Sequence, residues 1–209
     1  MKTNVKFLIA FILGVIAIFG IGLFSGTKLV HYDYEANQLK ESELKYWEVK
    51  AQLVDEVQNY INKVAPTSDL RALALIDACE EYSIDVKFAL AQGQKESHFG
   101  TKGLATKTNS VWNVGAYTGL TYAQIMSTYK YSHPNESIKP YLKLLYEKYM
   151  TAGAEAALLE KFVDHNGKRF ATDSKYEERL RYIYKNIGNE TKIDSLTAQL
   201  RYWAIKSNR

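Results

Sequence analysis

Two neighbouring stretches of the chain hold the residues best suited to chemistry. The first reads Ala89-Leu-Ala-Gln-Gly-Gln-Lys-Glu-Ser-His-Phe-Gly100, and the second reads Thr108-Asn-Ser-Val-Trp-Asn-Val-Gly115. The first is typical of a helix of small and apolar residues that carries Glu96 to its last turn and ends before Gly100. The second holds an indole and two carboxamides in a polar loop. The pattern therefore predicts an acid at a helix end, beside an aromatic loop.

Glu96 has the surroundings that a general acid needs. A carboxyl group in the last turn of a helix feels the negative end of the helix dipole, and apolar neighbours such as Phe99 and Trp112 further disfavour its ionised form. Both effects raise its pKa, so the group keeps its proton near neutral pH and can deliver it to the leaving oxygen of a glycosidic bond. The alternative is a solvated surface glutamate.

Three segments together resemble one known family. Residues 90–101 and 108–115 are similar to the glucosaminidase family (glycoside hydrolase family 73 of the lysozyme-like superfamily, of the flagellar-muramidase, autolysin and phage type). Its pattern is an Ala-Gln-x-x-x-Glu-Ser helix end, followed by a loop with Asn, an aromatic residue and Gly. A third segment, Gly167-Lys-Arg-Phe-Ala-Thr-Asp-Ser-Lys-Tyr176, resembles the segment before the family's last core helix. The matches cover about residues 68–188.

The resemblance implies a mainly α, lysozyme-like domain with a groove between lobes and a small irregular or β lobe. It implies an endo-β-N-acetylglucosaminidase, which cleaves the bond after N-acetylglucosamine in peptidoglycan glycan strands, with Glu96 as its general acid. Two alternatives fit the same residues. One is a lytic transglycosylase, and the other is a non-catalytic, wall-binding component of an envelope machine or phage particle.

The group that would activate water is less well defined. The best match to the family's second acidic residue is Glu136 in the segment His133-Pro-Asn-Glu-Ser137, although Glu136 could equally stabilise the N-terminus of the helix that follows. Asp164 and Asp173 are rivals, and Asp173 is well placed to cap the next helix.

One position departs from the family. Phe170 stands at or close to a position where the family usually has tyrosine, whose hydroxyl is thought to help the reaction. The role then passes to Tyr176 or is absent. Without a second polar group, the N-acetyl group of the substrate could act as an internal nucleophile.

Sugar binding is expected from an aromatic face and from carboxamides. Aromatic rings pack on the apolar side of a sugar, and carboxamides bond its hydroxyl and acetamido groups. On this basis the predicted substrate-binding residues are Trp112, Asn109, Asn113 and Tyr117, with His98 as a neighbouring hydrogen-bonding group. For Trp112 the alternative is a core tryptophan.

The N-terminal segment is apolar. The run Phe7–Phe24 has eighteen residues without a charge, and lysines flank it on both sides. Such a run can span a bilayer as a helix. We expect an uncleaved transmembrane signal anchor over residues 7–27, with a cleaved signal peptide as the alternative. The basic residues favour residues 1–6 in the cytoplasm, which places the remaining chain on the cell-wall side of a cell or, for a phage protein, in the virion.

A long helix follows the apolar run. Residues 34–64 contain neither Gly nor Pro, and apolar residues recur every seven positions, at Leu39, Tyr46, Leu53 and Tyr60. The second heptad position is polar, so self-association through this helix stays open, as does whether the helix packs on its own domain. We expect a helical stalk over 28–64, the glucosaminidase-like domain over 65–188 and a basic C-terminal helix over 189–209.

Further helices are expected in the domain. Asp85 caps a central helix from Val86 to about residue 97, and another helix over residues 175–187 ends at Gly188. Residues 122–126 are expected to form a short strand or turn.

The composition fits a folded protein. With 209 residues, 46% of them hydrophobic and 13% aromatic, the chain can build one domain with appendages, and wholesale disorder is excluded. The net charge is +4, and residues 166–209 hold ten Lys or Arg against five Asp or Glu. This density is too low to favour nucleic-acid binding. Cys79 is expected to be a buried, inert thiol. No metal-ligand cluster is visible, so no metal or cofactor is expected.

Overall fold

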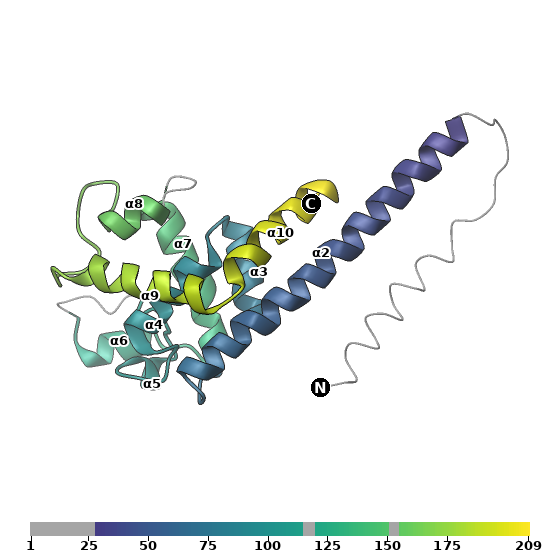
Figure 1. Ribbon diagram of the computed structural model, residues 1–209. Coiled ribbons are helices and arrows are strands. Elements are labelled where there is room, and N and C mark those ends of the chain that lie inside the picture. The colour runs from purple at the N-terminus through teal and green to yellow at the C-terminus, as the bar shows by residue number, and fades with distance from the viewer. Residues whose placement is uncertain (1–27, 115–119, 151–154) are drawn as a thin grey trace.

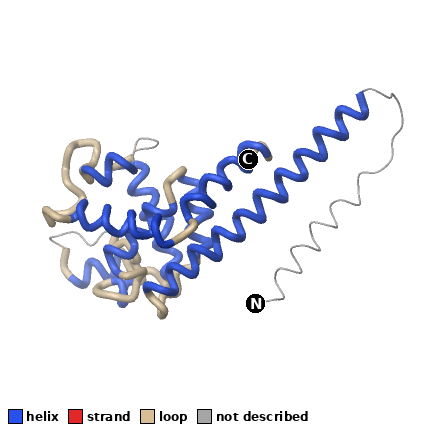
Figure 2. Tube along the Cα trace, in the orientation of Figure 1, coloured by secondary structure: helices blue, strands red, loops and turns tan. Residues whose placement is uncertain are grey.

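The computed structural model describes residues 28–114, 120–150 and 155–209. Within these ranges the chain forms helices and loops and no strand (Figure 2). The elements, labelled as in Figure 1, are α2 Lys28–Val64, α3 Ala72–Tyr82, α4 Val86–Ser97, α5 Ala105–Thr108, α6 Tyr122–Thr128, the 3-10 helix η1 Pro134–Ser137, α7 Ile138–Lys148, α8 Glu155–Glu160, α9 Tyr176–Glu190 and α10 Ile193–Lys206.

Helix α4 is the central helix that its small residues predict. Nine of its twelve residues are buried, and α9 packs along it. The Asp85 side chain caps its N-terminus by accepting the Lys87 N–H at 2.9 Å. A Cβ at Gly93 would lie 3.1 Å from Trp112 Nε1, so only glycine lets the indole pack this closely on the helix. The helix that carries Glu96 is therefore held by α9 and by the Trp112 indole.

Helix α2 is 37 residues long, and it packs on the body of the molecule from Ser42 onward. The first half projects from the domain, and α10 lies alongside the helix (Figure 1). The second half contributes to the core through a group of buried side chains, namely Tyr46, Val49, Leu53, Val57, Tyr60 and Ile61. The boundary between stalk and domain at residues 64 and 65 stays a prediction, but this part of the stalk packs on its own domain.

The expectation of a β lobe is not met in the described part of the chain. The nearest feature is a single antiparallel bridge between Val163 and Arg169. Residues 122–126, expected as a strand or turn, instead form helix α6. The cause is local, because Thr121 and Gln124 form a capping box at its start.

None of the described helices has the length and apolar character needed to cross a membrane. The predicted anchor at residues 7–27 lies outside the described residues.

The last core helix continues past Gly188, although the glycine there predicts that the helix ends. Helix α9 continues to Glu190. A Cβ at Gly188 would lie 2.9 Å from Asp194 Oδ2, and Asp194 accepts a hydrogen bond from Lys87 Nζ at 2.7 Å. Gly188 therefore lies beside the Lys87–Asp194 pair inside α9 and does not terminate the helix.

The buried half of α2 leads to a test of stability. Leu53 is 1% exposed and Leu44, on the same helix, is 54% exposed. We expect Leu53→Ala to lower the free energy of unfolding by about 2–5 kcal/mol, because it leaves a cavity in the core. Leu44→Ala is the matched control and should change it by less than about 0.5 kcal/mol. Urea unfolding measures the free energy of unfolding of both variants. An equally small loss in the two would mean that α2 is not part of the core.

Candidate active site

Three consecutive residues with positive φ shape the end of α4. They are His98, Phe99 and Gly100, with φ of 48°, 54° and 88°. This conformation is unfavourable for Phe99, which keeps it because its ring is fully buried and its carbonyl accepts a hydrogen bond from Ser68 Oγ at 2.6 Å. The backbone that directly follows Glu96 is therefore held in one conformation.

The loop after α5 is fastened to the same helix end. Ser97 Oγ donates to the carbonyl of Val111 at 2.6 Å, and it accepts the Gly100 N–H at 2.8 Å. The Asn113 side chain donates to the carbonyl of Glu96 at 3.1 Å. The structure thus brings together the helix end and the aromatic loop, as their sequence proximity predicts.

Glu96 meets Tyr176 from the start of α9. The Tyr176 hydroxyl donates to Glu96 Oε1 at 2.5 Å, across 80 positions of sequence. The Glu96 side chain is half-buried, and this burial raises its pKa; the hydroxyl of Tyr176, the charge of Lys95 and the amide of Asn113 oppose the rise. The net shift is upward, in the direction that a general acid requires.

Two neighbours of Glu96 had no role predicted from the sequence, although Gln92 belongs to the Ala-Gln-x-x-x-Glu-Ser pattern. Lys95 Nζ lies 4.5 Å from the centroid of the Tyr176 ring. Gln92 Nε2 donates to the Tyr176 hydroxyl oxygen at 3.1 Å. The signal that could have identified Gln92 is its spacing, because a residue four positions before Glu96 lies on the same face of the helix.

Trp112 lies in the core and does not present a free ring face. Its side chain is 1% exposed, and Nε1 donates to the carbonyl of Ala89 at 2.9 Å. The Tyr141 ring stacks on it with centroids 4.4 Å apart and planes at 5°. This placement does not fit the prediction that Trp112 packs on a sugar ring, because the indole is already covered.

The other predicted binding residues have different surroundings. The Asn109 side chain donates to the carbonyls of Tyr131 and Ser132, at 2.9 and 3.3 Å, and so ties two loops together. His98 is partly buried, which together with the nearby Lys102 charge lowers its pKa. Tyr117 lies outside the described residues.

Phe170 lies against the tyrosine that contacts Glu96. Its ring centroid is 5.5 Å from that of Tyr176, and it stacks on Phe162 at 4.4 Å. The phenylalanine therefore supports the Tyr176 ring. The hydroxyl beside Glu96 comes from Tyr176, and whether that residue takes the role of the missing tyrosine stays a prediction.

Glu136 lies in η1, where its carboxylate is exposed and bound locally. It accepts the backbone N–H of Ser132 at 3.0 Å and the Ser132 hydroxyl at 2.5 Å. These bonds hold the pKa of Glu136 below its usual value, so it is ionised at neutral pH. The element is tied to the aromatic loop, because the Val111 N–H donates to Ser137 Oγ at 3.2 Å.

The two rival aspartates are both engaged in turns. Asp164 Oδ1 accepts the N–H groups of Asn166 and Lys168, at 2.9 and 2.8 Å. Asp173 accepts the Lys175 N–H at 2.9 Å, which lowers its pKa, and it pairs with Arg179 at the start of α9. Both therefore act first as loop residues, and Asp173 is not the N-cap of α9, because that position is Lys175.

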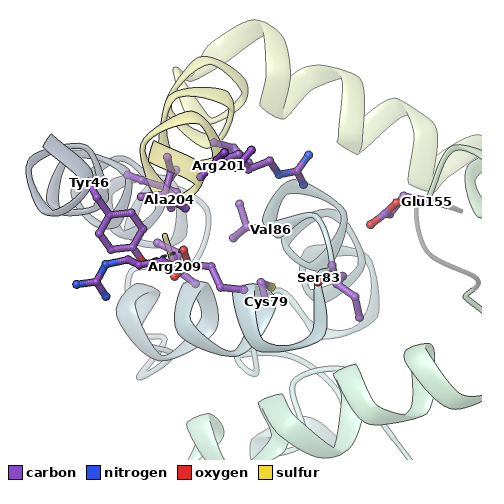
Figure 3. A pocket seen from close by; sticks show the side chains of 15 residues that line it. Tyr46, Cys79, Ser83, Val86, Glu155, Arg201, Ala204 and Arg209 are labelled. Atoms are coloured by element: carbon purple, nitrogen blue, oxygen red, sulfur yellow. Dashed lines mark hydrogen bonds between the residues drawn. The ribbon is translucent and has the colours of Figure 1, made fainter. Parts of the chain in front are cut away.

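A cavity of about 670 Å³ lies between α2, α3 and α10, away from Glu96. Figure 3 shows side chains from these helices and from Val86 around it. Its carboxylates are engaged, because Glu80 pairs with Lys50 at 2.5 Å and Glu155 accepts a backbone N–H at 3.0 Å. Burial raises the pKa of the Cys79 thiol, as expected for an inert cysteine. This cavity lacks an acid suited to proton transfer.

The described residues contain no group of three or more His, Cys, Asp and Glu side chains that could hold a metal ion.

The bond between Tyr176 and Glu96 predicts a measurable pKa. Hydrogen bonding to the carboxylate favours its ionised form, so we expect Tyr176→Phe to raise the pKa of Glu96 by about 0.5–1.5 units. NMR titration of the Glu96 carboxyl carbon measures this shift. Tyr182→Phe on the same helix, where the side chain is 70% exposed, is the control and should leave the pKa unchanged. A fall or no change in Tyr176→Phe would contradict the assignment.

The comparison with protein-family models gives one match. Residues 72–189 match the glucosaminidase family, described as mannosyl-glycoprotein endo-beta-N-acetylglucosaminidase. A search of curated proteins found no match. The matched segment runs from the first residue of α3 almost to the end of α9, so it contains Glu96, Glu136 and Tyr176. Since it covers more than half of the chain, this protein belongs to the glucosaminidase family and carries a glycoside hydrolase domain.

Proposed function

We propose that the protein is an endo-β-N-acetylglucosaminidase that hydrolyses the glycosidic bond after N-acetylglucosamine in peptidoglycan, with Glu96 as general acid. The observation that carries the proposal is the half-buried Glu96 carboxyl. Burial raises its pKa, and its Oε1 accepts a hydrogen bond from the Tyr176 hydroxyl at 2.5 Å. A carboxyl group that holds its proton near neutral pH can protonate the leaving glycosidic oxygen. Family membership supports the substrate class.

Tyr176 acts beside the acid in this mechanism. Its bond to Oε1 orients the carboxyl group and leaves Oε2 to carry the proton. As the proton leaves, the bond to the newly formed carboxylate becomes charge-assisted and therefore stronger. Tyr176 thus stabilises the state that Glu96 reaches in the transition state, which is how a positioned donor accelerates a reaction.

Glu136 is the proposed base that activates water. Two bonds from Ser132 keep its carboxylate ionised, and its exposure leaves it accessible to water. Asp164 and Asp173 accept backbone N–H groups in the same way and stay rivals, and Glu136 is preferred because it is the best match to the family's second acidic residue. The alternative needs no protein base, because the substrate's N-acetyl group would attack the sugar from within. Asn109, Asn113 and His98 stay the predicted substrate-binding residues, of which Asn113 donates to the Glu96 carbonyl.

Glu96→Gln tests the proposed acid. The substitution keeps the shape of the side chain and removes its proton, so hydrolysis of purified peptidoglycan should fall by at least about 100-fold. Glu190→Gln is the matched control, since Glu190 also ends a helix but pairs with Lys63 on the surface, and it should keep full activity. Undiminished clearing by Glu96→Gln would rule out the assignment.

The same assay tests the proposed base, Glu136, and identifies the product. Glu136→Gln should lower the rate by about 100-fold if Glu136 is the base. Activity that survives in this variant but is lost on de-N-acetylated peptidoglycan would instead indicate the substrate's N-acetyl group. Mass spectrometry of the products should give reducing-end N-acetylglucosamine, whereas anhydro sugars would identify a lytic transglycosylase. Wall binding without any product would favour the structural role.

We also propose that residues 7–27 anchor the protein in a membrane, with the hydrolase domain on the cell-wall side. The eighteen-residue apolar run Phe7–Phe24 and its flanking lysines support this. The full-length protein should stay with the membrane fraction in alkaline carbonate and enter solution only with detergent. Release by carbonate alone would indicate a peripheral protein or a cleaved leader.

A further inference from the structure

A chain of hydrogen bonds leads from the core of the molecule to the acid. The Tyr141 hydroxyl donates to Gln92 Oε1 at 2.6 Å, and Gln92 Nε2 donates to the Tyr176 hydroxyl at 3.1 Å. The Tyr176 hydroxyl then donates to Glu96 Oε1 at 2.5 Å. Three helices contribute, because Tyr141 lies on α7, Gln92 and Glu96 on α4, and Tyr176 on α9.

The chain has one consistent direction. A carboxamide presents a carbonyl on one side and an N–H group on the other. Gln92 Oε1 is the one acceptor that the described residues offer to the Tyr141 hydroxyl, which fixes the amide with Nε2 toward Tyr176. Because this N–H group occupies the oxygen of Tyr176, the phenolic proton points to Glu96.

Burial makes this direction costly to reverse. Gln92 and Tyr141 are both 0% exposed, so water cannot replace a lost partner. The Tyr141 ring is also clamped against Trp112 at 4.4 Å, and the indole is itself bound to the carbonyl of Ala89. A reversed amide would leave the Tyr141 proton without an acceptor among the described residues.

We propose that Tyr141 is a positioning residue: it turns the Gln92 amide so that Gln92 cannot accept the Tyr176 proton, which keeps the Tyr176 hydroxyl as a donor to Glu96 Oε1 and leaves Oε2 to carry the proton given to the glycosidic oxygen. This inference rests on the proposed role of Glu96 as general acid. It adds a second layer to the site, in which residues remote from the substrate decide which carboxyl oxygen is protonated. It also gives the buried Trp112 a part in the site, as the support for Tyr141.

The proposal predicts the effect of removing a single oxygen from the core. In Tyr141→Phe the Gln92 amide loses the partner that fixes it, and it can turn its carbonyl toward Tyr176. Tyr176 then donates to Gln92 instead of to Glu96. The Glu96 carboxylate loses a hydrogen bond, so its protonated form becomes relatively more stable. The pKa of Glu96 should rise by about 0.5–1 unit, measured by NMR titration of its carboxyl carbon. The alkaline limb of kcat/KM should move to higher pH by the same amount, because the acid must be protonated to act.

A second substitution should reverse the first. In Tyr141→Phe/Gln92→Met the side chain at position 92 can no longer accept the phenolic proton, so Tyr176 donates to Glu96 again. We expect the pKa of Glu96 to return to within about 0.3 unit of the original protein. The double variant should also be at least as stable to heat as Tyr141→Phe, since removing both partners of a buried hydrogen bond costs less than removing one.

The control variant is Tyr184→Phe, which deletes a tyrosine hydroxyl that donates to Asp85 Oδ2 at 2.7 Å on the far end of α4. It should leave the pKa of Glu96 unchanged. The proposal would be overturned if the pKa of Glu96 were unchanged in Tyr141→Phe. It would also be overturned if the pKa of Glu96 rose as far in the double variant as in Tyr141→Phe. Should Tyr141→Phe fail to fold, Gln92→Met alone decides: its pKa should stay near the original, and a rise as large as in Tyr176→Phe would overturn the proposal.

The NMR titration separates this proposal from the proposed function. If Glu96→Gln kept full activity, the assignment of the acid would fail, while the titration would still report whether Tyr141 and Gln92 orient Tyr176. If Glu96→Gln were inactive but the titration showed no effect of Tyr141→Phe, only the positioning role would be lost.

Discussion

The packing of α9 on α4 is the constraint on which the candidate site depends. It brings Tyr176 to Glu96 across 80 positions of sequence and half-buries the carboxyl group in doing so. Burial is the main reason that the pKa of Glu96 is raised, and the phenol that contacts it limits the rise. The pKa of Glu96 therefore depends on this helix pair, and residues that hold the pair together influence it without touching the carboxyl group.

Several small features serve that packing. Gly93 gives the Trp112 indole access to the backbone of α4. Phe170 supports the ring of Tyr176 on its other side. The left-handed turn at His98 fixes the backbone after the acid. These residues differ in type, but each restricts the conformations open to Glu96 or Tyr176. Such restriction is what makes a site preorganised.

The sequence predicted the local features of the site and much of the helical framework. The helix from Val86 to Ser97, its cap at Asp85 and the glutamate in its last turn follow from short-range rules, because caps and helix ends depend on neighbours within a few residues. Local rules failed where a distant contact outweighed them. Gly188 does not end its helix, and it lies inside α9 beside Asp194 of α10. Trp112, predicted to bind a sugar, is instead covered by Tyr141 from another helix.

By itself the sequence determined the helix that carries Glu96, the aromatic loop that follows and the likeness to the glucosaminidase family, since each is a pattern of adjacent residues. The tertiary structure alone decided that the second half of α2 joins the core, and which hydroxyl lies on the acid. It also decided the order of donors from Tyr141 through Gln92 to Tyr176. The reason is physical: burial and hydrogen-bond direction arise only when segments far apart in the chain exclude water together.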